Sequence, residues 1–206
     1  MIRKPSEAAP TVAPWVIRRA RRSDTNALLA YFAALAAETP NNTSIRRNTV
    51  SLTAEAVLDR ITRYERNPHS VLYLAVHAGS VIGIVSLTGD DSPFTAHQVE
   101  LSINVHSAWR GRGLGSALMQ TALAWARSQP HVERIQLEAL TRNTTAVRLY
   151  QRCGFVIEGV RRSAYHLVDE PGDAQAVDAI HMAYLVRRGP DGRVRETQQR
   201  SRWQEG

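Results

Sequence analysis

The segment from Val99 to Ser116 constrains the fold of this chain more than any other stretch. Apolar and polar residues alternate over 99–105, which predicts a strand with one buried face. The loop Arg110-Gly-Arg-Gly-Leu-Gly115 then leads into an apolar-periodic helix that Pro130 ends. Glycines let the backbone turn sharply and approach a ligand, and the N–H groups at a helix start bind anions. We therefore predict a strand–loop–helix unit that holds a phosphate or pyrophosphate.

The spacing of the glycines separates this loop from other nucleotide-binding loops. Gly111, Gly113 and Gly115 stand two residues apart, whereas the dinucleotide fingerprint spaces its glycines differently. A P-loop would need Lys followed by Ser or Thr, and Ser116 directly follows Gly115. Taken alone, the loop is also compatible with an ordinary tight turn. A second motif is needed to distinguish an anion-binding loop from such a turn.

That second motif is the segment 143–155. Asn143 is a suitable N-cap, and Gly154 is placed to end a helix in a left-handed conformation before a strand begins at Phe155. Four residues between them share one face at helical spacing, namely Ala146, Leu149, Tyr150 and Cys153. The segment predicts a short helix packed on a sheet.

The rest of the chain alternates between strand and helix patterns. We expect strands near 15–19, 71–76, 81–87, 98–105, 135–140, 155–166 and 176–186, and helices near 24–37, 53–64, 113–129 and 143–153. Ser23 or Asp24 is predicted to cap the first helix, and Ser51 or Thr53 the second. The sum is an α+β or mixed α/β domain over 14–188 around one central sheet. Residues 1–13 and 189–206 are expected to be flexible tails.

Composition narrows the class of protein. The 206 residues suit one domain, and the single cysteine, Cys153, excludes an intrachain disulfide and fits a reducing compartment. No signal peptide or 18-residue apolar span is present, so we expect a cytoplasmic protein without a membrane span. We also expect no metal site. The net charge of +7 comes mainly from arginines near both ends. Nucleic-acid binding through these ends stays an alternative, but the centre of the chain does not favour it.

The two motifs together resemble the GCN5-related N-acetyltransferase (GNAT) superfamily. They read Arg110-x-x-Gly-x-Gly115 after a strand, then Asn143-x-x-Ala-x-x-Leu-Tyr150 with Gly154-Phe155. The likeness covers about 16–186, and the chain end is similar to bacterial small-molecule and amino-acid acetyltransferases of the superfamily. It implies a mostly antiparallel, twisted sheet of about seven strands flanked by helices. It also implies acetyl-CoA as acetyl donor and direct attack by an amine in a ternary complex.

The resemblance also implies the residues that hold acetyl-CoA. Backbone groups of the strand end would pair with the pantetheine arm, at Ile103, Asn104 and Val105. Backbone N–H groups of the glycine loop would hold the pyrophosphate, at Arg110, Gly111, Arg112, Gly113, Leu114, Gly115 and Ser116. The thioester side would be lined by Asn143, Ala146 and Tyr150.

Acetyl transfer needs a base for the ammonium proton, a donor for the thioester oxygen and an acid for the departing thiolate. By resemblance, the backbone N–H near Val105 donates a hydrogen bond to the thioester oxygen, and Tyr150 is the acid for the thiolate. The alternative is that Tyr150 only packs between helix and sheet. Glu100 is the preferred base, Glu138 the second choice and His106 the third. Each glutamate could instead be a solvated or salt-bridged strand residue.

The acceptor is less constrained than the donor. In such folds the front helices and the last hairpin build the substrate site, with Asn41, Asn42, Thr43, Ser44, Tyr165 and Asp178 as candidates. We expect a small primary amine or amino acid. A protein N-terminus or lysine, and a non-catalytic acetyl-CoA-binding module, are the alternatives. A homodimer is an open alternative to a monomer.

Overall fold

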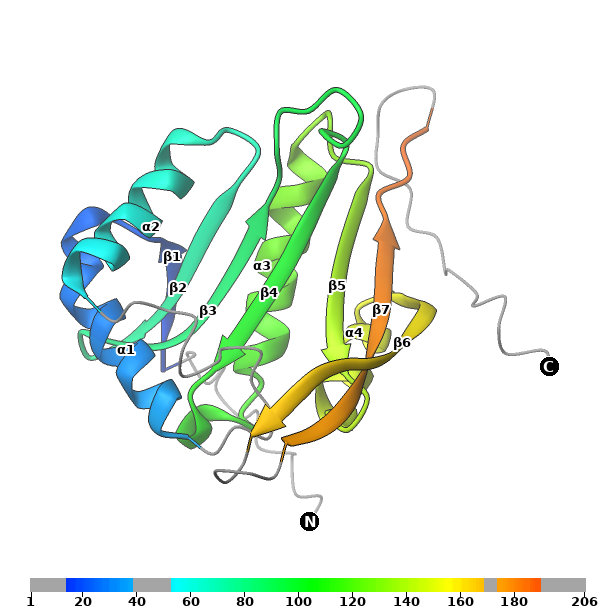
Figure 1. Ribbon diagram of the computed structural model, residues 1–206. Coiled ribbons are helices and arrows are strands. Elements are labelled where there is room, and N and C mark those ends of the chain that lie inside the picture. The colour runs from blue at the N-terminus through cyan, green and yellow to red at the C-terminus, as the bar shows by residue number, and fades with distance from the viewer. Residues whose placement is uncertain (1–13, 39–52, 169–173, 190–206) are drawn as a thin grey trace, which may run out of the picture.

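The protein is described as a computed structural model that covers residues 14–38, 53–168 and 174–189 (Figure 1). Its strands are β1 (Val16–Arg19), β2 (Val71–His77), β3 (Ser80–Thr88), β4 (Gln98–Val105), β5 (Arg134–Leu140), β6 (Val156–Val168) and β7 (Ala174–Leu185). Its α-helices are α1 (Thr25–Ala37), α2 (Ala54–Arg66), α3 (Leu114–Ser128) and α4 (Thr144–Arg152), with short 3-10 turns η1 (Arg22–Asp24) and η3 (Ser107–Trp109). Residues 1–13 and 190–206 lie outside the described residues, and they include the predicted tails 1–13 and 189–206 except for Gly189.

The seven strands form one sheet in the order β1-β2-β3-β4-β5-β7-β6. Every neighbouring pair is antiparallel except β4 and β5, which run parallel and are joined through α3. A parallel pair needs a crossover, and the helix after the glycine loop supplies it. The predicted fold class, a mostly antiparallel sheet of about seven strands flanked by helices, is confirmed.

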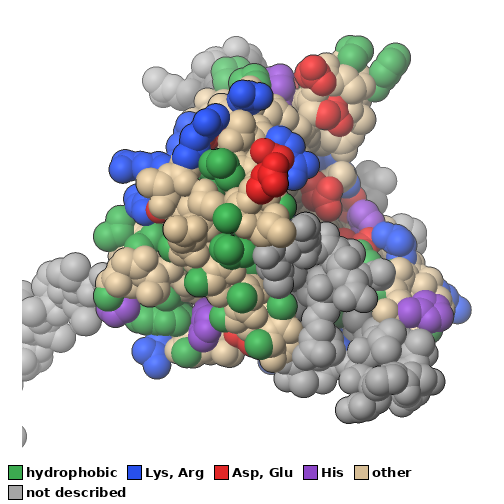
Figure 2. Space-filling view, turned by 60° about the vertical axis from the view of Figure 1, so that its left-hand side comes forward, with side chains coloured by type: hydrophobic (Ala, Val, Ile, Leu, Met, Phe, Trp, Pro, Cys, Tyr) green, Lys and Arg blue, Asp and Glu red, His purple; other side chains and the backbone are tan. Residues whose placement is uncertain are grey.

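Two apolar layers hold helices on opposite faces of the sheet (Figure 1). On one face α1 and α2 pack against β2 and β3, with Leu28, Phe32 and Ile61 among the buried contacts. Figure 2 turns the α1–α2 side forward and shows Arg side chains gathered on its upper part. This layer covers only the β1–β3 half of the sheet.

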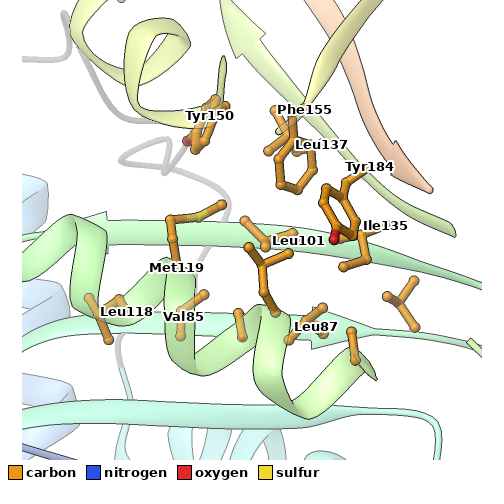
Figure 3. Close-up of a cluster of buried hydrophobic side chains, with 14 of the residues drawn as sticks. Val85, Leu87, Leu101, Leu118, Met119, Ile135, Leu137, Tyr150, Phe155 and Tyr184 are labelled. Carbon is orange, nitrogen blue, oxygen red and sulfur yellow. The ribbon is translucent and has the colours of Figure 1, made fainter. Parts of the chain in front are cut away.

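On the other face α3 lies over the middle of the sheet, and Leu118 and Met119 are fully buried against it (Figure 3). Cutting a buried side chain of this size to alanine typically costs about 2–5 kcal/mol. Tyr150 of α4 joins the same layer, so the second motif packs beside the first. The position of α4 next to α3 therefore follows from apolar burial.

The starts of the two front helices differ from the prediction in one case. Thr53 caps α2 as predicted, because its hydroxyl accepts a hydrogen bond from the Ala56 N–H at 3.2 Å. Asp24 makes no side-chain cap for α1; instead it accepts two bonds from Arg18, both at 2.7 Å, and one from the Arg21 N–H. The Arg18 hydrogen bond outweighs burial and lowers the pKa of Asp24. The carboxylate thus ties β1 to η1.

β4 and β5 separate along their length, and this separation positions the site. They pair only where 98–100 face 134–136. Beyond this point β4 still pairs with β3 up to Val105, and β5 still pairs with β7 up to Leu140. The sheet therefore opens between two strands that are each anchored on their outer side.

None of the described helices is long and apolar enough to cross a membrane.

Candidate active site

A cavity of about 610 Å³ occupies the opening between β4 and β5; we call it the central cavity. It is lined by residues of β4, the glycine loop, β5, α4 and β6. These are Ile103, Asn104, Val105, Arg110, Gly111, Gly113, Gly115, Ser116, Glu138, Ala139, Leu140, Asn143, Thr145, Ala146, Leu149, Tyr150, Arg152 and Tyr165. The volume is typical of small-molecule sites, which span about 300–1,000 Å³.

The glycine loop has the backbone that an anion cradle requires. Gly111 and Gly113 adopt φ of +71° and +83°, a region that side chains disfavour. Gly113 is the N-cap residue of α3 and, having no side chain, leaves the N–H groups of the first turn free of a side-chain cap. Gly115 serves packing, because a Cβ there would lie 3.2 Å from Leu149 of α4. These positions and Ser116 line the central cavity, so the residues present fit a pyrophosphate.

Arg110 is held in place from a distant helix. Its guanidinium forms an ion pair with Glu38 after the end of α1, and its Nε donates to the Val105 carbonyl at 2.9 Å. The Ser107 N–H donates to the other Glu38 oxygen at 2.8 Å. Burial raises the pKa of Glu38, but the hydrogen bonds from Ser107 and the Arg110 charge outweigh it and lower the pKa overall. Sequence reasoning missed Glu38, since no local pattern links it to the loop.

Two predicted loop residues point their side chains elsewhere. The Arg112 guanidinium lies over the Trp109 ring, 5.2 Å from its centroid. Leu114 is fully buried at the start of α3. Neither is among the residues that line the central cavity. At these two positions only backbone groups could contribute to the anion cradle.

The free edge of β4 offers N–H groups to the central cavity. The His106 N–H donates to the Ile82 carbonyl of β3 at 3.0 Å. Because successive N–H groups of a strand point to opposite edges, those of Val105 and Ile103 point into the opening. The carbonyl of Asn104 accepts a hydrogen bond from the Tyr31 hydroxyl at 3.0 Å, which fixes β4 to α1. Burial raises the pKa of Tyr31 well above its usual range.

Tyr150 reaches the central cavity from α4, and Figure 3 shows its hydroxyl directed away from Phe155. Tyr150 is only 7% exposed. Burial, with a smaller contribution from Cys153, raises the pKa of Tyr150 to about 12. The phenol is therefore neutral and a hydrogen-bond donor at neutral pH. Its hydroxyl has no hydrogen-bond partner within the described part of the chain.

Glu138 enters the central cavity from β5. One of its oxygens, Oε2, accepts a hydrogen bond from Arg161 at 2.6 Å and lies 3.0 Å from His181 Nε2. His181 faces Glu138 directly across the β5–β7 register. The other oxygen, Oε1, is buried and without a hydrogen-bond partner among the described residues. One oxygen is thus held in place and the other is free to accept a proton.

Glu100 lies on the same side of the sheet as Glu138 but outside the central cavity. Val99 and Leu101 pack toward α3, so Glu100 points to the opposite face, as Glu138 does between Leu137 and Ala139. It is exposed and pairs with Thr88 and Gln136 in the closed part of the sheet. It is not among the described residues that line the central cavity. The structure brings Glu138 and Tyr150 to one cavity, not Glu100.

The remaining predicted residues divide between cavity lining and local support. Asn143 and Ala146 line the central cavity, and the Asn143 side chain also caps α4 by accepting from the Ala146 N–H at 3.2 Å. His106 accepts from the Ala108 N–H at 3.2 Å within its own turn.

Among the predicted acceptor-site residues, Tyr165 lines the central cavity. Asp178 instead accepts from the Ser163 N–H at 2.8 Å, which supports the irregular turn of β6 where Ser163 has φ +49°. Residues 41–44 lie outside the described residues.

Several lining residues had no sequence signal. Thr145 and Arg152 come from α4, where the sequence pattern marks them only as ordinary helix-surface positions. Arg161 and His181 contact Glu138 only because β7 pairs with β5 and β6 in turn pairs with β7. Across the residues that the structure covers, no group of His, Cys, Asp or Glu could hold a metal ion.

The sequence profile of the Acetyltransferase (GNAT) family matches residues 34–155, and the chain belongs to this family. It is 32% identical over 105 residues to the L-amino acid N-acetyltransferase AaaT of Escherichia coli. The aligned residues cover 51% of this chain and 62% of that protein. It is 33% identical over 121 residues to an L-methionine sulfoximine/L-methionine sulfone acetyltransferase of Pseudomonas aeruginosa, 54% of this chain and 69% of that protein. The crystal structure of a GNAT-family acetyltransferase from Streptococcus pneumoniae superposes with a TM-score of 0.76 at 30% identity, covering 83% of this chain and 98% of that one.

The chain spans 62% of the length of AaaT and 60% of that of N-acetyltransferase family 8 member 2 of Rattus norvegicus, to which it is 33% identical over 68% of its own length.

Proposed function

We propose that this protein is an acetyl-CoA-dependent N-acetyltransferase that acts on the primary amine of a small molecule, with free amino acids and their analogues as the substrate class. The observation that carries the proposal is the central cavity. It joins the glycine cradle at the start of α3 to Tyr150 and to the free oxygen of Glu138. The amino-acid class is supported by the activities for which AaaT and the Pseudomonas acetyltransferase are named.

Acetyl-CoA supplies the activated acetyl group in this proposal. The N–H groups between Gly111 and Ser116 hold its pyrophosphate, and the N–H groups of Ile103 and Val105 pair with the pantetheine arm. Arg152 of α4 lines the same cavity and adds positive charge beside the phosphates. With the donor held in this way, we expect its thioester to lie near Tyr150 in the opening between β4 and β5.

Glu138 is the proposed base. An alkylamine is an ammonium ion at neutral pH, since a lysine amine has a pKa near 10.4, and it must lose a proton to become nucleophilic. The free Oε1 of Glu138 accepts this proton, directly or through one water, while Arg161 and His181 hold Oε2. The sequence alone favours Glu100 as the base. Glu138 replaces it because Glu138 shares the central cavity with Tyr150.

The neutral amine then attacks the thioester carbon, so that a C–N bond forms as the C–S bond breaks. The Val105 N–H donates to the thioester oxygen as negative charge develops on it. Tyr150 donates a hydrogen bond to the departing sulfur. With a pKa of about 12, its phenol is a weaker acid than an ordinary thiol, whose pKa is about 8.5, so hydrogen bonding matters more than full proton transfer. As the amide forms, the nitrogen loses its second proton and the departing sulfur takes up one proton, so CoA leaves as a thiol. Glu138 releases the first proton, which it gained from the ammonium ion, to solvent.

The decisive experiment measures thiol release from acetyl-CoA with a panel of amines: the common L-amino acids, methionine sulfone, polyamines and peptides with free N-termini. We expect turnover with amino acids and little with peptides. Tyr150→Phe should lower kcat by about 10–100-fold with little change in acetyl-CoA KM, since it removes a donor used in the transition state. Preferential peptide turnover would favour the protein-acetylating alternative. Acetyl-CoA binding without turnover of any amine would favour the non-catalytic module.

A further inference from the structure

A second cavity, of about 660 Å³, lies at the other end of the sheet from the central cavity. It opens between the last two turns of α2, the 67–70 connection and the end of β3 at Thr88. Val105 lines the central cavity and pairs with Gly83 near the start of β3. The second cavity, which we call the distal cavity, is therefore separated from the proposed acetyl-transfer chemistry by the length of β3.

Three arginines line one wall of the distal cavity. Arg60, Arg63 and Arg66 stand three residues apart on α2, which places like charges on neighbouring turns. None of them forms an ion pair within the described residues, whereas Arg22 nearby binds Glu65 at 3.0 Å. The wall therefore carries positive charge that the described part of the chain does not neutralise.

Arg60 is the most constrained of the three. Its guanidinium lies over the Phe32 ring at 5.3 Å, and its Nε is buried without a hydrogen-bond partner among the described residues. A buried N–H donor without an acceptor is costly, and an anionic oxygen would satisfy it. The position of Arg60 is thus fixed by packing, and its unused donor lies in a side chain that lines the distal cavity.

The remaining lining residues are mostly polar, and several of them are held by hydrogen bonds. The Tyr64 hydroxyl and Thr88 Oγ1 are 3.0 Å apart, and the Asn67 amide donates to the Gly89 carbonyl at 2.9 Å. His69 Nδ1 lies 3.0 Å from His131 Nε2. Asp91 is the one acidic side chain among the described lining residues, against three arginines. This balance favours an anionic ligand.

We propose that the distal cavity binds a small anion that carries two or more phosphate or carboxylate groups. The planar guanidinium fork matches both groups with paired hydrogen bonds, and three arginines along one wall can contact more than one group. A concave site of this volume suits a small molecule, whereas nucleic acid would need a longer basic surface. Figure 2 shows the basic side chains on the upper part of the α1–α2 side, the part where α2 lies in Figure 1. The proposal does not rest on acetyl transfer.

The test is calorimetric titration of the full chain with tripolyphosphate and, separately, citrate, with CoA at saturating concentration so that the glycine loop is filled. The two probes distinguish a phosphate from a carboxylate ligand. Arg63→Gln with Arg66→Gln should weaken binding of the preferred probe at least tenfold. Arg60 is left intact because it packs on Phe32. The matched control is Arg162→Gln with Arg187→Gln, two exposed arginines outside the distal cavity, which removes the same net charge.

Thermal unfolding of both double variants checks that each is folded. Binding that is lost only in the α2 variant supports the proposal. Three results would overturn it: neither probe binds the wild-type chain, both double variants lose binding equally, or a duplex oligonucleotide competes with the probe and binds more tightly. The last result would assign the arginines to nucleic acid.

Discussion

The two walls of the central cavity are built in different ways. One wall is a single continuous segment, from Ile103 to Ser116, in which strand, turn and helix follow each other. The other wall is assembled from β5, α4 and β6, and its key carboxylate, Glu138, is held by Arg161 and His181 from β6 and β7. The continuous wall carries the proposed donor-binding groups and the assembled wall the proposed proton chemistry. Donor and acceptor functions can therefore be perturbed separately.

The largest effect is expected in the assembled wall. Glu138→Gln keeps the shape of the side chain but removes its basicity, so we expect kcat to fall by about 100-fold or more, as for loss of a general base. Acetyl-CoA binding should be nearly unchanged, because the cradle lies in the other wall. Steady-state kinetics across pH 6 to 10 measure both, and the variant should regain activity as rising pH neutralises the amine. Glu100→Gln is the matched control; a greater loss there would return the base to Glu100.

The continuous wall should respond through binding. Gly113 has φ +83°, and nothing lies within 4 Å of the position that a Cβ would take. Gly113→Val should therefore act through backbone strain and not through a steric clash. Such strain costs about 1–2 kcal/mol, and relief by a shift of the loop should weaken acetyl-CoA binding roughly tenfold. Calorimetry measures the affinity.

Gly79 provides the control for Gly113, since it has φ +80° and open space around it but lies in the β2–β3 turn. Gly79→Val should lose similar stability while acetyl-CoA affinity stays at the wild-type value. Equal loss of affinity in both variants would mean that the loop has no special role in binding the donor.

The same contrast explains what the sequence could and could not predict. The left-handed conformation of Gly154, the cap at Asn143 and the strand before the loop depend on neighbours within a few residues, and all were predicted. The partnership of Glu138 with His181 depends on the register of β5 against β7, which no local pattern specifies. Asp24 shows the same limit on a small scale. Its carboxylate could accept from the N-terminus of α1 or from Arg18 of β1, and in the structure it accepts from Arg18.

A smaller effect is expected where a distant element supports the continuous wall. Glu38→Gln removes the charge that holds Arg110 and weakens the contact with the Ser107 N–H. We expect the KM for acetyl-CoA to rise by about two- to fivefold with kcat unchanged, since partly exposed ion pairs contribute about 1 kcal/mol or less. Glu65→Gln breaks the exposed pair with Arg22 and should leave KM as it is. A kcat effect in Glu38→Gln would mean that this carboxylate acts in the chemistry.

The smallest effect is expected in a region outside both walls, the contact between His69 and His131. Burial, followed by the charges of His69 and Arg188, lowers the pKa of His131 below its usual value near 6.5. The unfolded chain therefore takes up this proton at a higher pH than the folded chain does. The contribution of His131 to stability is full above pH 6.5 and falls as the pH drops through 6.5 toward the lowered pKa of the folded chain.

Urea unfolding between pH 8 and 5 tests this expectation, in a pH range above the ordinary pKa values of carboxylates. His131→Gln should flatten the profile, and an unchanged slope would place the pH dependence elsewhere. Because the contact is far from Glu138, the variant should keep the wild-type pH profile of kcat, which separates a stability effect from the proton chemistry of the assembled wall.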